Sequence, residues 1–185
     1  GRTNMKCKLF LAEGFEELEA VTLIDLLRRA GFQVDTVSIS DKREVAGSKG
    51  TTIVADCVFS KENFSDTDFI LLPGGMPGVK NLSEKKELLS LIKDFDNKKK
   101  YIGAICAAPF VLERAGILKG RKVTSYPGWK EKLPSASYSE DAVVVDGNII
   151  TSRGVGTAID MALKIVEIIK GVESKEKLKK EIVYQ

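Results

Sequence analysis

The sequence contains no histidine among its 185 residues. Histidine is the most common general base and metal ligand at physiological pH. Its absence excludes a Ser-His or Cys-His dyad, even one completed by a second copy of the chain. The cysteines, Cys7, Cys57 and Cys106, are odd in number and match neither a disulfide framework nor a zinc site. Unpaired cysteines indicate a reducing compartment, which predicts a cytoplasmic protein, and we expect Cys7 and Cys57 to pack in the core.

Long apolar runs and strong charge are also absent. No segment approaches the roughly 20 apolar residues that a membrane-spanning helix needs, and residues 1–5 contain no apolar signal core. The 29 basic and 26 acidic residues leave a net charge of +3, spread along the chain. This balance gives no basis for binding nucleic acid or a membrane surface. Residues 1–4 are interpreted as a cloning remnant, with Met5 as the natural first residue.

Length and composition favour a single domain over residues 5–185. A chain of this length can bury one sizeable core and is short for two domains. A hydrophobic content of 43% with 30% charged residues is typical of a globular protein. Strand-like and helix-like segments alternate, which predicts an α/β fold with a mostly parallel sheet covered on both faces. Reactive groups in such folds lie beyond the carboxyl ends of the strands.

The individual elements follow from hydrophobic spacing and turn residues. Apolar or alternating runs predict strands at residues 6–12, 33–40, 69–72, 101–105, 123–124, 142–145 and 148–152, with a small edge hairpin around 51–55. Helical spacing predicts helices at residues 16–29, 83–96, 107–115, 157–170 and 174–183. Ser83 is the expected cap of the second helix, and Asp146-Gly147 indicates a hairpin between the last two strands.

The segment Gly103-Ala104-Ile105-Cys106-Ala107-Ala108-Pro109 joins a predicted strand to a predicted helix. A nucleophile on so tight a turn needs small residues two positions before and after it, and Ala104 and Ala108 meet this need. The first turn of the helix would stabilise a thiolate and lower the pKa of Cys106. The N–H of Ala107 would face an oxyanion formed there. The alternative is that this cysteine is a small buried core residue.

Two glycine-containing segments are expected near the same sheet edge. Pro73-Gly74-Gly75 follows a predicted strand, and glycine lets backbone N–H groups approach a ligand closely, although a plain turn fits equally well. Residues 151–157, Thr-Ser-Arg-Gly-Val-Gly-Thr, precede a helix but lack the Walker lysine pattern and a dinucleotide fingerprint. We interpret them as a glycine-rich wall of a pocket or of a subunit contact.

Three glutamates open the first predicted helix. Glu16 and Glu17 are interpreted as solvated charges that complement the helix dipole. Glu19 lies one turn further along, and if it faces the sheet edge it would be partly buried. Its pKa would then be raised, and the protonated carboxyl group could donate a hydrogen bond to a cysteine sulfur or oxide.

Four motifs in this order resemble the ThiJ/PfpI superfamily and, within it, the DJ-1 branch, over residues 6–183. They are Glu-Glu-Leu-Glu ending at Glu19, Leu-Pro-Gly-Gly ending at Gly75, Ala-Ile-Cys-Ala-Ala-Pro ending at Pro109, and Thr-Ser-Arg-Gly-x-Gly-Thr ending at Thr157. The resemblance implies a flavodoxin-like three-layer αβα sandwich that forms a homodimer. It also implies a reactive cysteine near the dimer interface.

The resemblance also assigns roles and an activity. It implies that Glu19 is the protonated partner of Cys106, and that Gly75 and Ala107 donate N–H groups to an oxyanion. It implies a cofactor-free conversion of methylglyoxal and glyoxal to hydroxy acids, a disputed protein deglycase activity, and protection against oxidative stress. The remaining pocket residues that we expect are Gly74, Tyr126, Arg153 and Gly154. A small aldehyde is the expected partner, with no metal or cofactor.

The sequence departs from the family pattern at two positions. Many relatives have a histidine in the segment that here reads Thr-Ser-Tyr-Pro over residues 124–127, and Val155 stands where proline is common. A protease triad of the PfpI type is therefore excluded. An aldehyde-converting enzyme and a redox sensor that acts through oxidation of Cys106 to sulfinate both remain open, as does a non-catalytic binding module.

Overall fold

The computed structural model describes residues 4–185, so residues 1–3, most of the segment interpreted as a cloning remnant, lie outside the described part. A seven-stranded sheet with the strand order β10-β11-β7-β6-β1-β2-β5 forms the centre of the fold. Neighbouring strands are parallel except β10, which pairs antiparallel with β11. The strands are β1 (Lys6–Leu11), β2 (Gln33–Ser38), β5 (Cys57–Val58), β6 (Phe69–Leu72), β7 (Tyr101–Ile105), β10 (Val143–Asp146) and β11 (Ile149–Ser152).

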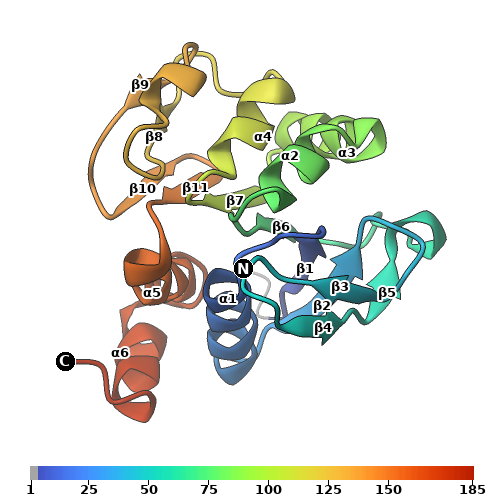
Figure 1. The fold of residues 1–185 in the computed structure, drawn as a ribbon. Helices are drawn as coiled ribbons and strands as arrows, with labels where there is room; N and C mark the ends of the chain where they lie inside the picture. Colours follow the sequence, from blue (N-terminus) through green and yellow to red (C-terminus); the bar gives the residue numbers. More distant parts are fainter. Residues whose placement is uncertain (1–3) are drawn as a thin grey trace.

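Helices cover both faces of this sheet (Figure 1). One face carries α1 (Glu17–Arg29), α5 (Ala158–Lys170) and α6 (Val172–Glu181), and the other carries α2 (Gly78–Ser83), α3 (Lys86–Asn97) and α4 (Pro109–Arg114). A separate group of buried apolar side chains fills each interface between helices and sheet. The predicted α/β sandwich with a mostly parallel central sheet is confirmed. None of the helices within residues 4–185 is long and apolar enough to cross a bilayer.

The central strands are apolar on both faces because helices cover both. All four residues of β6 are buried, as expected for a strand inside a parallel sheet. The carboxyl ends of β1, β6, β7 and β11 point the same way. The segments that follow these strands therefore meet along one edge, which is where the candidate site lies.

Several predicted elements differ from the observed ones. The helix expected over residues 83–96 is α3, which begins at Lys86 with Lys85 at its N-cap. Ser83 is not its cap but the last residue of α2, and its hydroxyl donates to the Lys80 carbonyl at 2.7 Å. The hairpin near residue 53 is confirmed, but β3 (Glu44–Ala46) and β4 (Thr52–Val54) form a sheet of their own, and β5 is the edge of the main sheet. Likewise β8 (Lys122–Val123) pairs only with β9 (Ser137–Tyr138). Three short 3-10 helices complete the list: η1 (Phe59–Lys61), η2 (Lys130–Lys132) and η3 (Val155–Thr157).

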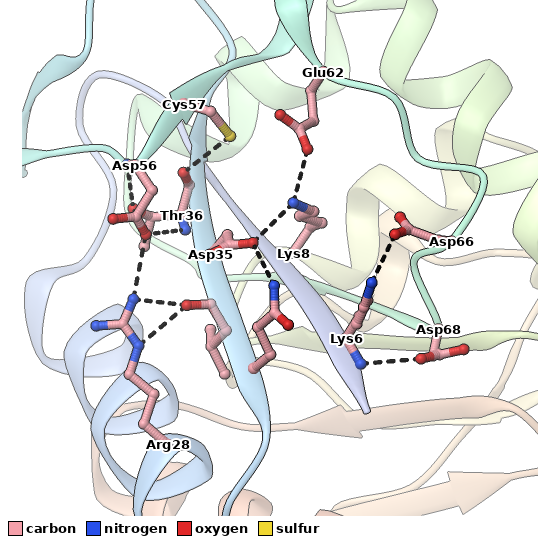
Figure 2. Close-up of polar contacts among 12 residues, drawn as sticks. Lys6, Lys8, Arg28, Asp35, Thr36, Asp56, Cys57, Glu62, Asp66 and Asp68 are labelled. Carbon is pink, nitrogen blue, oxygen red and sulfur yellow. Dashed lines mark hydrogen bonds and ion pairs between the residues drawn. The ribbon is translucent and has the colours of Figure 1, made fainter. Parts of the chain in front are cut away.

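Charged side chains link β1 and β2 to the residue that follows η1 (Figure 2). Lys8 lies in β1 and is only 7% exposed. Its ammonium group contacts Asp35 Oδ2 at 3.0 Å and Glu62 Oε1 at 2.9 Å. A lysine buried this far needs such partners, because an unpaired charge away from water is costly.

Candidate active site

The turn between β7 and α4 places Cys106 in a strained backbone conformation. Its φ angle is 66°, in the left-handed region that residues other than glycine rarely adopt. Ala104 and Ala108 on either side are completely buried, as the predicted tight turn requires. The backbone is held on both sides, since the Cys106 N–H donates to the Ser152 carbonyl at 3.0 Å and the Cys106 carbonyl accepts from the Tyr126 N–H at 2.8 Å.

Glu19 reaches the same place from the first turns of α1. Its side chain is completely buried, and Oε1 accepts a hydrogen bond from the Gly74 N–H at 2.9 Å. A Cβ atom added at Gly74 would lie 2.6 Å from Cys106 Cβ and 2.7 Å from Glu19 Oε1. The carboxyl and thiol groups therefore flank one glycine and interact with each other. Only a glycine leaves room for this contact.

The protonation of the two groups is coupled. Burial raises the pKa of Glu19 to about 7, although the Gly74 N–H and the Cys106 thiol act in the opposite direction. Burial, followed by the nearby Glu19 carboxyl group, raises the pKa of Cys106 to about 12, against the N–H groups of Ala107 and Gly75. The raised pKa predicted for Glu19 is confirmed. The lowered pKa predicted for Cys106 is wrong, because burial and an adjacent carboxylate outweigh the backbone dipoles.

This pair can share a proton. The Oε2 atom of Glu19 is buried and has no partner of regular hydrogen-bond geometry. Such an oxygen is better satisfied when it carries a proton that it can donate to the neighbouring sulfur. A carboxyl group with a pKa near 7 is also matched to accept the thiol proton at neutral pH. The arrangement therefore allows Glu19 to take the thiol proton as the sulfur attacks an electrophile, without a histidine.

Backbone donors face the sulfur from two loops. The N–H groups of Gly75 and Ala107 both interact with Cys106. Gly75 has a φ angle of 94°, and a Cβ there would lie 2.4 Å from the backbone nitrogen of Glu16. Glycine is thus required for the loop after β6 to turn its N–H toward the sulfur. The structure brings together the two donors that the resemblance implies.

A pocket of about 630 Å³ opens over this pair. Of the expected site residues, Glu19, Gly75, Cys106, Tyr126, Arg153 and Gly154 line it. Gly74 and Ala107, which we also expected there, are buried and are not part of the lining. Tyr126 is 46% exposed.

Residues 153–157 form one wall of the pocket, as predicted. The Thr157 hydroxyl fixes the segment by accepting from the Arg153 N–H at 3.1 Å and the Gly154 N–H at 3.0 Å. The Arg153 guanidinium donates from Nε to the Ser125 carbonyl at 2.9 Å and from Nη2 to the Tyr138 hydroxyl at 3.4 Å. Its position is thus set by neutral acceptors.

The sequence analysis missed the role of Glu17. This residue is 8% exposed, and its carboxylate accepts from the Lys49 N–H at 3.0 Å and the Thr51 N–H at 2.9 Å. Burial alone would raise its pKa, but these backbone donors hold it below the usual range. The solvated interpretation of Glu17 is wrong. Glu16 accepts from the Leu18 N–H at 2.9 Å and caps α1.

The anchored loop places Ser48 and Lys49 in the pocket lining. It is also tied to the start of α1 by the Ser48 N–H, which donates to the Phe15 carbonyl at 2.7 Å. Some 30 residues separate this loop from the glutamates in the sequence, and its composition is that of an ordinary turn. Only the tertiary contact with Glu17 could have identified it.

The other two cysteines lie away from the pocket. Cys7 is completely buried, and its burial raises the pKa to about 12. Cys57 is partly buried, its thiol contacts the Thr36 carbonyl at 3.6 Å (Figure 2), and burial with the nearby Glu62 raises its pKa to about 11. Both pack against the core, as predicted. Within residues 4–185, no group of three or more acidic, cysteine or histidine side chains is placed to hold a metal ion.

Comparison with known proteins gives a consistent result. The model of the DJ-1/PfpI family matches residues 5–168. "Protein DJ-1 homolog B" of Arabidopsis thaliana is 40% identical over 171 residues, which cover 92% of this chain and 39% of that protein. This chain thus spans about two fifths of that relative. "Glutathione-independent glyoxalase DJR-1.2" of Caenorhabditis elegans is 38% identical, over 91% of this chain and 90% of that protein. The solved structure of oxidized DJ-1 from Toxoplasma gondii superposes with a TM-score of 0.93 at 36% identity, covering 97% of this chain and 98% of that chain.

Proposed function

The chain belongs to the DJ-1/PfpI family, and on that premise we propose that it converts 2-oxoaldehydes such as methylglyoxal and glyoxal to 2-hydroxy acids without a cofactor. The buried contact between Glu19 and Cys106 carries this proposal, because it supplies a nucleophile and a base whose pKa is about 7. A relative named as a glutathione-independent glyoxalase supports the choice of substrate class.

The reaction starts with nucleophilic attack. Glu19 takes the thiol proton while Cys106 Sγ forms a bond to the aldehyde carbon, which gives a hemithioacetal. The N–H groups of Gly75 and Ala107 stabilise the negative charge on the former carbonyl oxygen.

Proton transfers then complete an internal oxidation and reduction. Glu19 first passes the thiol proton to the oxygen of the former aldehyde, which completes the hemithioacetal and restores the carboxylate. It then removes the proton from the former aldehyde carbon and returns it to the adjacent carbon, while the hydroxyl proton moves to the oxygen of the former ketone. The aldehyde carbon becomes a thioester as the ketone becomes an alcohol. Water hydrolyses the thioester, so the S–C bond breaks, the thiol is restored and the hydroxy acid leaves. Methylglyoxal plus one water thus gives lactic acid, with no external oxidant or reductant.

Purified protein incubated with methylglyoxal tests the proposal. Lactate should form, Cys106→Ser should abolish its formation, and Glu19→Gln should lower kcat by about 10²–10⁴-fold, the usual contribution of a positioned acid–base group. Cys57→Ser is the matched control, because that thiol lies outside the pocket, and should retain full activity. Undiminished turnover in the Cys106 or Glu19 variant would exclude the mechanism.

Redox sensing through Cys106 is the second candidate function. The same donors that stabilise a thiolate would stabilise a sulfinate, and a protonated Glu19 could donate to one of its oxygens. Two molecules of peroxide would each transfer one oxygen to the sulfur and leave as water. Mild peroxide treatment followed by peptide mass spectrometry should add two oxygens at residue 106 alone. Equal oxidation of all three cysteines would count against sensing.

We also propose that the protein is a homodimer through the exposed side of α1. This side carries Leu18, 59% exposed, and Val21, 46% exposed, and hollows on both flanks are lined by Val54 and by Ile159 and Val183. Apolar groups gathered in this way are typical of subunit contacts. Leu18 precedes Glu19, so the contact would lie near the site. Light scattering should give twice the chain mass, and Leu18→Glu should give the monomer.

We also propose that the protein acts in the cytoplasm. Cys7, Cys57 and Cys106 are all free, which suits the reducing cytoplasm, where we expect the protein to act.

A further inference from the structure

The pocket is larger than a three-carbon aldehyde requires. Pockets of about 300–1,000 Å³ typically accommodate drug-sized ligands, and this one measures about 630 Å³. Its wall also contains two cationic side chains, Lys49 and Arg153, that the proposed reaction does not use. Spare volume and unused positive charge suggest that the natural substrate carries a further, negatively charged group.

Arg153 offers a fixed positive charge without a counter-ion. Its guanidinium is oriented by the Ser125 carbonyl and the Tyr138 hydroxyl, which are both uncharged. It forms no ion pair with any carboxylate of the described residues. Its Nη1 group has no partner there either and can bind an incoming anion. A guanidinium is well suited to carboxylate and phosphate groups because it presents parallel N–H donors.

Lys49 supplies the second charge from a different loop of the same lining. Its backbone N–H donates to both Glu17 carboxylate oxygens, at 3.1 Å and 3.0 Å, and the Thr51 N–H donates to the same carboxylate. A Cβ added at Gly47 would lie 2.3 Å from Glu17 Cδ, so the loop is closely packed on this anchor. The Lys49 ammonium group lies 3.5 Å from the Ser48 hydroxyl and forms no ion pair within residues 4–185.

Acidic groups in the same lining do not cancel these charges. Glu19 is uncharged below its pKa of about 7. Glu16 is engaged by the Leu18 N–H at the start of α1, where the helix dipole offsets a negative charge. The pocket therefore attracts anions most strongly at mildly acidic pH, where Glu19 is protonated.

We propose that Lys49 and Arg153 form an anion-recognition site that selects 2-oxoaldehydes bearing a carboxylate or phosphate group on the chain beyond the ketone. The substrate class rests on the proposed function, whereas the anion site itself does not. Glu17 is a positioning residue for this site, because it holds the loop that carries Lys49 and touches no substrate.

Two alkylating reagents of similar size but different charge test the site without turnover. Iodoacetate is anionic and iodoacetamide is neutral, and each forms an S–C bond to Cys106 with loss of iodide. The ratio of their rate constants, followed by mass spectrometry at low salt, cancels the intrinsic reactivity of the thiol. Lys49→Met and Arg153→Met should each lower this ratio by about two- to fivefold, as expected for one exposed charge interaction. Arg153→Lys keeps the charge and should retain most of the ratio.

Lys42→Met is the matched control, since Lys42 is an exposed lysine outside the pocket, and its ratio should equal that of the wild type. Raising the salt concentration should lower the wild-type ratio toward that of Lys49→Met, because salt screens exposed charges. If Lys49→Met and Arg153→Met both match the control, the anion site is wrong.

A kinetic comparison then tests the substrate class. The preference in kcat/KM for a phosphate-bearing 2-oxoaldehyde over methylglyoxal should be lower in Lys49→Met than in Lys42→Met, which should keep the wild-type preference. An equal preference in both proteins overturns the assignment of the substrate. If no 2-oxoaldehyde is turned over although the alkylation ratios differ, the proposed function fails and the anion site stands.

Discussion

Burial of the Glu19 carboxyl group should make the stability of the fold depend on pH. The pKa of this group is raised from 4.5 to about 7. When folding raises the pKa of a group, the group contributes its full stability at a pH below its pKa in the unfolded chain. This stability is lost as the pH rises through its pKa in the folded protein. Each pKa unit corresponds to about 1.4 kcal/mol, so the wild type should lose about 3 kcal/mol between pH 4 and pH 8 from this group.

The Glu19→Gln variant isolates this effect, because glutamine has a similar shape and no charge to bury. Urea unfolding of both proteins at intervals from pH 4 to pH 8 gives the free energy of unfolding at each pH. The stability of the variant relative to the wild type should rise by about 3 kcal/mol across this range, with most of the change between pH 4.5 and pH 7. The cysteine does not titrate in this window, because its pKa is raised from 9.0 to about 12.

Glu17→Gln is a control of opposite sign on the same helix. The pKa of Glu17 is lowered, so its contribution to stability is present above the unfolded pKa and is lost as the pH falls through the folded one. The free energy of unfolding of the wild type should therefore exceed that of this variant by the largest amount at neutral pH. A difference between wild type and Glu19→Gln that stays constant from pH 4 to pH 8 would refute the conclusion that burial raises the pKa of Glu19.

Three further outcomes follow from the geometry. Gly74→Ala should lower methylglyoxal turnover by about 10²-fold and stability by about 1–3 kcal/mol, because its Cβ would lie 2.6 Å from Cys106 Cβ. Gly154→Ala, with no atom within 4 Å of the added Cβ, should leave thermal unfolding unchanged, and equal effects of the two alanines would contradict the packing argument. The kcat/KM of the wild type should rise with pH through about 7 as Glu19 becomes a base, and a flat profile would count against that role. Lys8→Met should lower the free energy of urea unfolding by about 1–3 kcal/mol, because it leaves Asp35 and Glu62 without their cation; unchanged stability would show that this pairing is unimportant.

The sequence alone was sufficient to predict the central strands and the tight turn that carries Cys106. Residues 69–72 are a short apolar run followed by Pro-Gly-Gly, and they form β6 with these bounds. Residues 101–105 are a second such run, followed by a nucleophile with small neighbours, and they form β7 with these bounds. Both features depend on side-chain volume and hydrophobicity within a few residues, which a sequence displays directly. The hairpin at Asp146-Gly147 was predictable for the same reason, and Gly147 has a φ angle of 58°.

Features that depend on distant contacts were not predictable. The direction of the Cys106 pKa shift depends on burial and on a carboxyl group 87 positions away in the chain. The loop that carries Lys49 becomes part of the pocket through contacts with Glu17 and Phe15, more than 30 residues away in the sequence. In each case the deciding interaction joins residues that have no local relationship.

The first turn of α1 sorts three identical side chains into different surroundings. Successive residues of a helix point about 100° apart, and so Glu16 turns back to the helix end, Glu17 reaches the backbone of a loop, and Glu19 enters the pocket. Aspartate, one methylene shorter, would still cap α1 at position 16, because aspartate is a preferred N-cap residue. At position 17 it would release the loop, and at position 19 it would hold the base out of reach. A substitution table that treats this acidic run as interchangeable surface charge would misjudge both Glu17 and Glu19.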